Sequence, residues 1–251
     1  MAVDTELTNG VAVVTLNDPD RRNALSADLV AGIVAAFDEL EAEPTCAAVI
    51  VTGAGTAFCA GADLGDLSRV GEEGLRQIYE GFLRVARSPL PTIAAVNGPA
   101  VGAGMNLALA CDVRIVGTSG RFDTRFVKLG IHPGGGHTWM MRRLVGPQAT
   151  AAMVLFGEVV RGADAVGSGL AWDCVPDDEL LARCRTLAAG AAGSPPELVQ
   201  RVKASAAAVA DLDDHDEAMQ VELTAQLWSM TDPVFRQRLA DLHTQISDGT
   251  R

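Results

Sequence analysis

Two glycine-rich stretches hold the residues of this chain that are best suited to chemistry. Residues 57–64 read Ala-Phe-Cys-Ala-Gly-Ala-Asp-Leu, and residues 97–106 read Asn-Gly-Pro-Ala-Val-Gly-Ala-Gly-Met-Asn. Small side chains let a ligand approach the backbone, and a helix that begins at such a turn directs free N–H groups at that ligand. Two such donors that meet at one oxygen form an oxyanion hole. The alternative is that both stretches are tight turns packed against their neighbours.

Each stretch follows a segment that is expected to be a strand. Residues 47–52 form a continuous apolar run, which is typical of a strand covered on both faces. Residues 92–96 lead into the second stretch, and the apolar residues that follow it up to Cys111 predict a helix. The second stretch therefore has the pattern strand, glycine turn, helix.

The rest of the chain predicts an α/β core followed by helices. Asn9-Gly10 between residues 5–7 and 11–16 is a hairpin signal, and Ser26 is an expected N-cap. The further expected strands are 113–117 and 171–175, and the expected helices are 72–87, 138–144, 147–156, 162–169, 177–190, 197–210, 213–229 and 232–246. Because Gly-Ser-Pro-Pro at 193–196 marks the clearest boundary, we expect an α/β core over residues 1–193 and a helical region over residues 194–251.

Composition narrows the class of partner. The net charge is −12, which argues against nucleic acids and anionic membranes, since both require a basic face. The uncharged residues 92–111 are not expected to span a membrane, because Asn97, Pro99 and Asn106 interrupt them. The N-terminus does not read as a signal peptide, and the five cysteines contain no CxxC pair, so a reduced, cytoplasmic protein is expected.

Other ligand sites fit the sequence poorly. A dinucleotide fingerprint fails because Leu107 and Phe58 stand where its third glycine is required, and no Gly-Lys-Ser/Thr of a Walker loop occurs. His132 and His137 as a metal pair lack a third ligand nearby, so no metal site is expected.

Taken together and in order, the motifs resemble those of the crotonase superfamily, the enoyl-CoA hydratase/isomerase family. The matching segments are residues 18–26 (Asp-Pro-Asp-Arg-Arg-Asn-Ala-Leu-Ser), 57–64, 97–112, 129–136 and 162–175. The resemblance covers about residues 5 to 190. Each motif alone is weak evidence for the family, whereas the whole set is specific to it.

This resemblance implies a spiral of repeated β-β-α turns with C-terminal helices that build homotrimers or dimers of trimers. It also implies lyase or isomerase activity in fatty-acid metabolism on an acyl-CoA thioester, with coenzyme A as part of the substrate and no permanently bound cofactor. By position, the backbone N–H groups of Ala60 and Ala103 would bind the thioester oxygen. The residues that would line the coenzyme A and substrate site are Arg22, Ala24, Leu25, Gly61, Ala62, Asp63, Leu64, Gly102, Asn106, Phe126 and Gly134.

The family's usual proton-transfer residues are missing from this pattern. A hydratase of the family uses two glutamates, and the resemblance places them at Asn106 and Phe126. Neither residue exchanges a proton, whereas adding water across a double bond needs both a proton donor and a proton acceptor. Ordinary hydratase chemistry is therefore not expected.

Substitutes must come from nearby residues. His137 at the start of the helix after the glycine turn is our first choice, and His132 before that turn is the second, because histidine titrates near neutral pH. Asp123 is a further candidate, although it can pair with Arg125, and Asp66 can reach a pocket mouth. Two hypotheses stay open: an enzyme that works through an enolate-like intermediate, and a non-catalytic acyl-CoA carrier or sensor.

Overall fold

The computed structural model describes residues 2–63, 71–247 and 249, and divides into two units, residues 1–192 and 193–251. The division falls within one residue of the boundary expected from Gly-Ser-Pro-Pro. Among the described residues, no helix is both long and apolar enough to cross a membrane.

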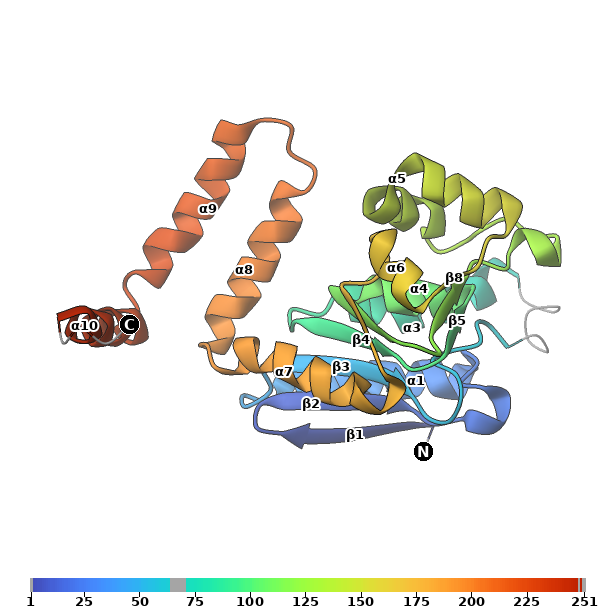
Figure 1. Ribbon diagram of the computed structural model, residues 1–251, viewed down its shortest axis with the longest axis horizontal. Coiled ribbons are helices and arrows are strands. Elements are labelled where there is room, and N and C mark those ends of the chain that lie inside the picture. Colours follow the sequence, from blue (N-terminus) through green and yellow to red (C-terminus); the bar gives the residue numbers. More distant parts are fainter. Residues whose placement is uncertain (1, 64–70, 248, 250–251) are drawn as a thin grey trace. The chain divides into compact units, whose positions relative to one another are not determined.

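A six-stranded sheet forms the base of the first unit in the described part of the chain (Figure 1). Its strands, in spatial order, are β1 (Val3–Thr8), β2 (Val11–Leu16), β3 (Ala48–Gly53), β4 (Thr92–Val96), β6 (Val113–Gly117) and β9 (Asp173–Val175). β1 and β2 form the expected antiparallel hairpin at Asn9-Gly10, and every later pair is parallel. The fold is α/β, as the sequence predicts.

Both faces of this sheet are buried, which explains the unbroken apolar runs. Along β2, Val11 and Val13 face one cluster, whereas Ala12 and Val14 face the other, because successive side chains of a strand point to opposite faces. Helix α7 (Leu180–Ala192) covers the first face. Helix α1 (Ala27–Ala42), which begins at the expected Ser26 N-cap, covers the second with α3 (Glu72–Ala86) and α4 (Ala103–Ala110).

A second, three-stranded sheet in the described residues carries the elements around the glycine turns. It consists of β5 (Pro99–Val101), β7 (Arg121–Asp123) and β8 (Val160–Arg161). The remaining elements of the first unit are the 3₁₀ turns η1 (Pro19–Arg21), η2 (Val127–Leu129) and η3 (Asp177–Glu179) and the helices α5 (His137–Phe156) and α6 (Gly162–Gly167). Helix α6 packs against β8.

Some elements differ from their expected form for local reasons. Residues 99–101, expected as a turn, form strand β5, because they pair with β7 far along the chain. The two helices expected on either side of residues 145–146 are joined as α5, although Gly146 with φ 73° and ψ −179° is non-helical and marks a kink.

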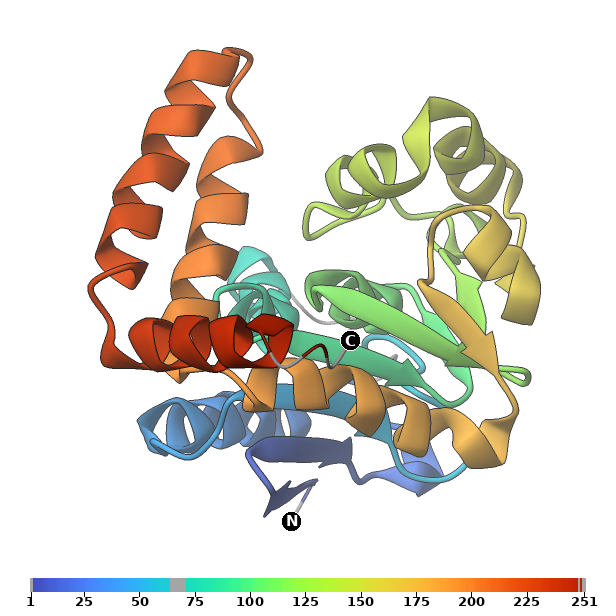
Figure 2. The same cartoon turned by 60° about the vertical axis from the view of Figure 1, so that its left-hand side comes forward.

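The second unit contains α8 (Pro196–Val209), α9 (His215–Ser229) and α10 (Pro233–Ser247), close to the three expected helices. α8 and α9 lie side by side (Figures 1 and 2). In the described part of these helices no side chain is fully buried, and large apolar residues such as Leu227, Leu242 and Ile246 are exposed.

Candidate active site

Backbone hydrogen bonds join the two glycine-rich turns to each other. The Cys59 N–H donates to the Pro99 carbonyl at 3.1 Å, and the Val101 N–H donates to the Cys59 carbonyl at 3.0 Å. Gly104 in α4 allows this approach, since a Cβ at that position would lie 2.2 Å from the Cys59 oxygen. Two stretches that are 40 residues apart in sequence therefore meet as one wall, as the oxyanion-hole interpretation requires.

Two asparagine side chains hold the first glycine-rich turn in place through hydrogen bonds to its backbone. Asn23 is fully buried, and its Nδ2 donates to the carbonyls of Ala54 and Ala57, both at 2.9 Å. Asn97 Nδ2 donates to the Gly53 carbonyl at 2.8 Å, and Asn97 Oδ1 accepts from the Gly53 N–H at 3.2 Å. Both ends of the loop after β3 are thus held by amide groups that both donate and accept.

Two glycines in unusual conformations bring specific amides together. Gly61 has φ +105° and Gly102 has φ 52° with ψ −116°, which are regions that favour glycine. A Cβ on Gly61 would lie 2.8 Å from the Val101 carbonyl oxygen and 3.8 Å from the Ala103 nitrogen. The peptide between Gly61 and Ala62 consequently lies next to the first residue of α4.

The assignment of Ala60 as an oxyanion donor has to be corrected. Its N–H already donates to the Arg22 carbonyl at 3.0 Å, so it is not available to a ligand. The Ala62 N–H, two residues later, has no acceptor among the described residues, although the carbonyl of the same peptide, that of Gly61, accepts from the Leu25 N–H. The Ala103 N–H is also free in the described structure, because it belongs to the first turn of α4.

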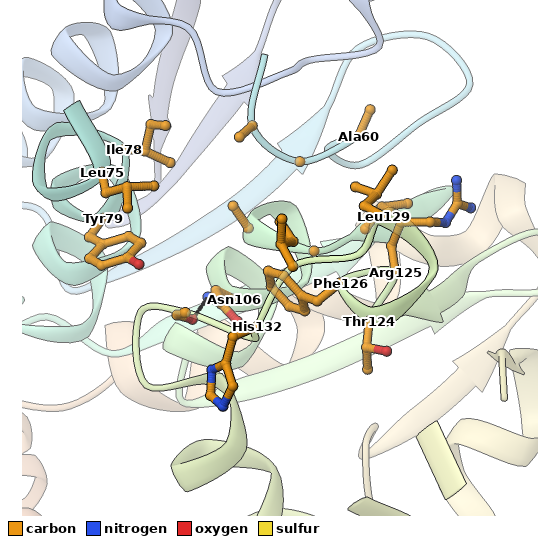
Figure 3. A pocket seen from close by; sticks show the side chains of 17 residues that line it. Ala60, Leu75, Ile78, Tyr79, Asn106, Thr124, Arg125, Phe126, Leu129 and His132 are labelled. Atoms are coloured by element: carbon orange, nitrogen blue, oxygen red, sulfur yellow. Dashed lines mark hydrogen bonds between the residues drawn. The ribbon is translucent and has the colours of Figure 1, made fainter. Parts of the chain in front are cut away.

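A pocket of about 340 Å³ opens at this wall, within the size range of small-molecule sites. Its lining includes Ala60, Gly61, Ala62, Gly102, Ala103, Asn106, Phe126, His132 and Gly134, which the sequence nominates. The other lining residues are Leu75, Ile78, Tyr79, Val101, Thr124, Arg125, Leu129 and Ile131. Most of the surface is apolar, and a few polar groups project into it (Figure 3).

His137 does not line this pocket. It is 1% exposed, and its Nδ1 lies 2.7 Å from Asn106 Oδ1, while its ring packs edge-on against Phe126 with centroids 5.0 Å apart. Burial lowers the pKa of His137 to about 4, so the ring is neutral at pH 7. Its Nε2 is buried and has no partner among the described residues. The geometry therefore disfavours His137 as the group that exchanges a proton with a ligand.

His132 is the histidine at the pocket. It is exposed, and its Nδ1 lies 2.7 Å from the Pro133 carbonyl oxygen. A carbonyl oxygen accepts, so in the neutral ring Nδ1 carries the proton and Nε2 can take one up. Figure 3 shows its ring directed away from Phe126, on the side of Asn106.

The Asp123 side chain does not line the pocket. It is 3% exposed, and its Oδ2 accepts from Arg125 Nε at 3.0 Å and from Arg125 Nη2. Its other oxygen is buried without a partner in the described residues. Figure 3 shows Arg125 pointing away from Asn106 and Phe126. The Asp123–Arg125 pair that the sequence offered as an alternative to catalysis is present.

The residues of the N-terminal motif that are expected to bind coenzyme A lie beside the first glycine-rich turn. The Arg22 carbonyl accepts from Ala60, and the Leu25 N–H donates to the Gly61 carbonyl at 2.8 Å. Ala24 and Leu25 are buried, and Asp63 pairs with Arg21 at 3.4 Å. Leu64 and Asp66 lie outside the described residues.

Cys59 is a packing residue at the centre of this wall. Its side chain is fully buried, and burial raises the pKa of its thiol to about 12. The thiolate required of a nucleophile is therefore absent at neutral pH.

The residues of α3 are the part of the site that sequence reasoning missed. Leu75, Ile78 and Tyr79 form one pocket wall, and Tyr79 is the single tyrosine of the chain. The helical spacing of Ile78, Phe82 and Val85 predicts a buried apolar stripe on this helix. The one sequence feature that could have pointed to a pocket wall here is the single tyrosine beside that stripe.

The model of the family described as "Enoyl-CoA hydratase/isomerase" matches residues 6–234 of this chain. The chain belongs to the enoyl-CoA hydratase/isomerase family. It is 51% identical to a Mycobacterium tuberculosis protein named "Probable enoyl-CoA hydratase EchA14", over 92% of this chain and 93% of the relative. It is 34% identical to the Escherichia coli 1,2-epoxyphenylacetyl-CoA isomerase, over 76% of each chain.

Solved structures agree with this family assignment. An enoyl-CoA hydratase from Bacillus anthracis superposes with a TM-score of 0.92 at 29% identity, covering 98% of this chain and 97% of that one. The crotonase-like α/β fold expected from the motifs is therefore confirmed. In this enoyl-CoA hydratase/isomerase family member, the pocket lies where both expected oxyanion-hole stretches meet.

Proposed function

We propose that this protein binds an acyl-CoA thioester in the 340 Å³ pocket and stabilises negative charge on the thioester oxygen with the N–H groups of Ala62 and Ala103. The observation that carries the proposal is that both amides lie at one pocket wall without acceptors among the described residues. Ala103 adds the partial positive charge at the start of α4.

The chemistry of thioesters explains why such amides matter. Removing a proton next to the carbonyl, or adding a nucleophile to it, places negative charge on the carbonyl oxygen. Preorganised N–H donors stabilise that charge, and loss of one such donor costs about 3–4 kcal/mol in well-studied enzymes. The site therefore suits reactions that pass through an enolate or a tetrahedral oxyanion, such as isomerisation, thioester hydrolysis, decarboxylation or C–C cleavage.

For proton transfer we propose His132 in place of the missing glutamates. It lines the pocket, and a histidine side chain can both accept and donate a proton. We expect His132→Gln to lower kcat about 100-fold with little change in acyl-CoA affinity, because general acid–base groups contribute in that range. Equal kcat values for His132→Gln and the parent protein would remove this role.

A second function, a non-catalytic acyl-CoA carrier or sensor, is favoured by one observation. The two positions at which the resemblance places glutamates hold Asn106, whose side-chain amide is hydrogen-bonded, and Phe126, which is apolar. Such a protein would keep the oxyanion donors and return its ligand unchanged.

We further propose that the second unit mediates assembly into a homotrimer or a dimer of trimers. Its helices expose apolar residues, and a groove of about 280 Å³ is lined by Leu198, Trp228, Phe235, Leu239 and Leu242 among others. Clustered exposed apolar side chains mark association surfaces. Coenzyme A is expected to act as part of the substrate, with no permanently bound cofactor.

Isothermal titration and a turnover screen together test the function. The purified protein is titrated with butanoyl-CoA and with free coenzyme A, and is then incubated with crotonyl-, 3-hydroxybutanoyl- and malonyl-CoA. We expect tighter binding of butanoyl-CoA than of free coenzyme A, and turnover of at least one ester. Binding without turnover would support the carrier or sensor, and failure of butanoyl-CoA to bind would refute both functions.

A further inference from the structure

The orientation of the Asn106 side chain is fixed by its partners. The group that faces the Gly134 carbonyl oxygen at 3.0 Å must be the donor Nδ2, because a carbonyl oxygen only accepts. Oδ1 therefore faces His137, and His137 Nδ1 must carry the proton in that 2.7 Å contact. The hydrogen bond from the buried His137 therefore orients the Asn106 side chain so that Oδ1 points into the protein interior.

The nitrogen of Asn106 lies on the pocket side. Gly134 lines the pocket and His137 does not, so Nδ2 is the end of the amide that is closer to a ligand. Nδ2 carries two protons, and Gly134 accepts one of them. Asn106 thus offers a hydrogen-bond donor where a glutamate would offer an acceptor.

The Tyr79 hydroxyl is a second polar group beside the same glycine. A Cβ on Gly134 would lie 2.3 Å from the Tyr79 hydroxyl oxygen, so this hydroxyl is close to the backbone that Asn106 contacts. Tyr79 has no hydrogen-bond partner among the described residues, and its ring packs against Phe82 with centroids 5.6 Å apart. Figure 3 shows the ring reaching from α3 into the pocket on the side of Asn106.

Helix α4 sets the spacing between this pair and the oxyanion amides. Ala103 and Asn106 are three residues apart, which corresponds to a rise of about 4.5 Å along the helix axis. The neighbouring lining residues Ile78 and Phe126 are apolar. A ligand oxygen a short distance beyond the thioester carbonyl would meet the Asn106 and Tyr79 donors, whereas a plain alkyl chain would leave both without a partner.

We propose that Asn106 and Tyr79 form a second donor site, which binds a carbonyl-type oxygen on carbon 3 of the acyl group and so selects 3-oxoacyl-CoA or malonyl-type CoA thioesters. This inference rests on the proposed function, because the first donor site must hold the thioester. His137 is a positioning residue that orients Asn106. Ketone and carboxylate oxygens share the acceptor chemistry, and the experiment separates them.

The relative affinities for three acyl-CoA esters test whether the second donor site exists. Acetoacetyl-CoA, malonyl-CoA and butanoyl-CoA are titrated into the full-length protein, into Tyr79→Phe and into Asn106→Asp. Tyr79→Phe removes the hydroxyl and retains the ring, so it is expected to fold even where Asn106→Asp does not. Thr186→Ala, which removes an exposed hydroxyl on α7, is the control.

We expect the parent protein and Thr186→Ala to bind acetoacetyl-CoA or malonyl-CoA roughly tenfold more tightly than butanoyl-CoA, and Tyr79→Phe to lose roughly fivefold of that preference. The ester that is preferred identifies the ketone or the carboxylate as the acceptor. Equal affinity for all three esters in the parent protein, or unchanged selectivity in Tyr79→Phe, would overturn the second donor site. Failure of every ester to bind would instead refute the proposed function.

Discussion

Asn106 and His137 act as a coupled pair rather than as two independent candidates. The imidazole is neutral because burial outweighs any stabilisation of its charged form, and its one proton is committed to Asn106 Oδ1. The residue type alone suggested an acid or base, whereas burial converts His137 into a support for its neighbour. A histidine in a sequence predicts proton transfer only where the fold also leaves it exposed to a ligand.

The buried His137 makes stability dependent on pH. Its pKa is about 4 in the folded chain and 6.5 in the unfolded chain, so the unfolded chain binds the additional proton between these values. Stability from this residue is therefore complete above pH 6.5 and is lost as the pH falls towards 4. We expect about 2 kcal/mol of unfolding free energy to be lost between pH 7 and pH 5 through His137.

Urea unfolding at both pH values checks this expectation. His137→Gln keeps a donor for Asn106 but does not titrate, so its loss between pH 7 and pH 5 should be smaller by that amount. His243→Gln, at an exposed position of α10, serves as the control and should follow the parent protein. An identical pH dependence in His137→Gln and the parent would show that His137 is not buried neutral.

At the scale of elements, the site depends on the contact between the first turn and α4. Gly104 places its Cα against the backbone of Cys59, and this contact sets the separation of Ala62 from Ala103. The contact joins segments that are remote in sequence, so local patterns predict each turn but not the register between them. A second remote contact, from the Ala60 N–H to the Arg22 carbonyl, is why Ala62, and not Ala60, carries the free amide.

Gly104→Ala tests the importance of this contact. The new methyl group would lie 2.2 Å from the Cys59 oxygen and 2.7 Å from its sulfur. We expect a loss of about 1–3 kcal/mol in unfolding free energy, as in overpacked cores, and weaker binding of butanoyl-CoA. Gly167→Ala in α6 is the matched control, because a Cβ there meets nothing within 4 Å and should leave both quantities unchanged.

At the scale of the whole molecule, the sequence predicts the strands and helices better than their associations. The bounds of β4 and β6 match the expected ones, because each strand lies between clear breaks, even though β6 contains Arg114. Strands β5 and β8 were missed, since they have three and two residues and each is defined by its partner. The pocket wall from α3 was missed for the same reason, because a helical stripe does not identify the cavity that its edge faces.

The exposed apolar side chains of the second unit predict self-association. Leu239 and Leu242 line its groove and are 43% and 52% exposed, respectively. We expect light scattering to give a mass three or six times the 26.1 kDa of the chain, and the double variant Leu239→Asp with Leu242→Asp to shift it towards the single-chain mass. A monomeric parent protein, or a double variant with unchanged mass, would contradict assembly through this groove.

The central claim is that the backbone amides of Ala62 and Ala103 hold a thioester oxygen, and a crystal structure with bound butanoyl-CoA tests it most directly. We predict that the thioester oxygen lies within hydrogen-bond distance, about 2.7–3.2 Å, of both nitrogens, with the acyl chain between Ile78 and Phe126. An ester carbonyl bound elsewhere, or an Ala60 N–H released from Arg22 to hold that oxygen in place of Ala62, would contradict it.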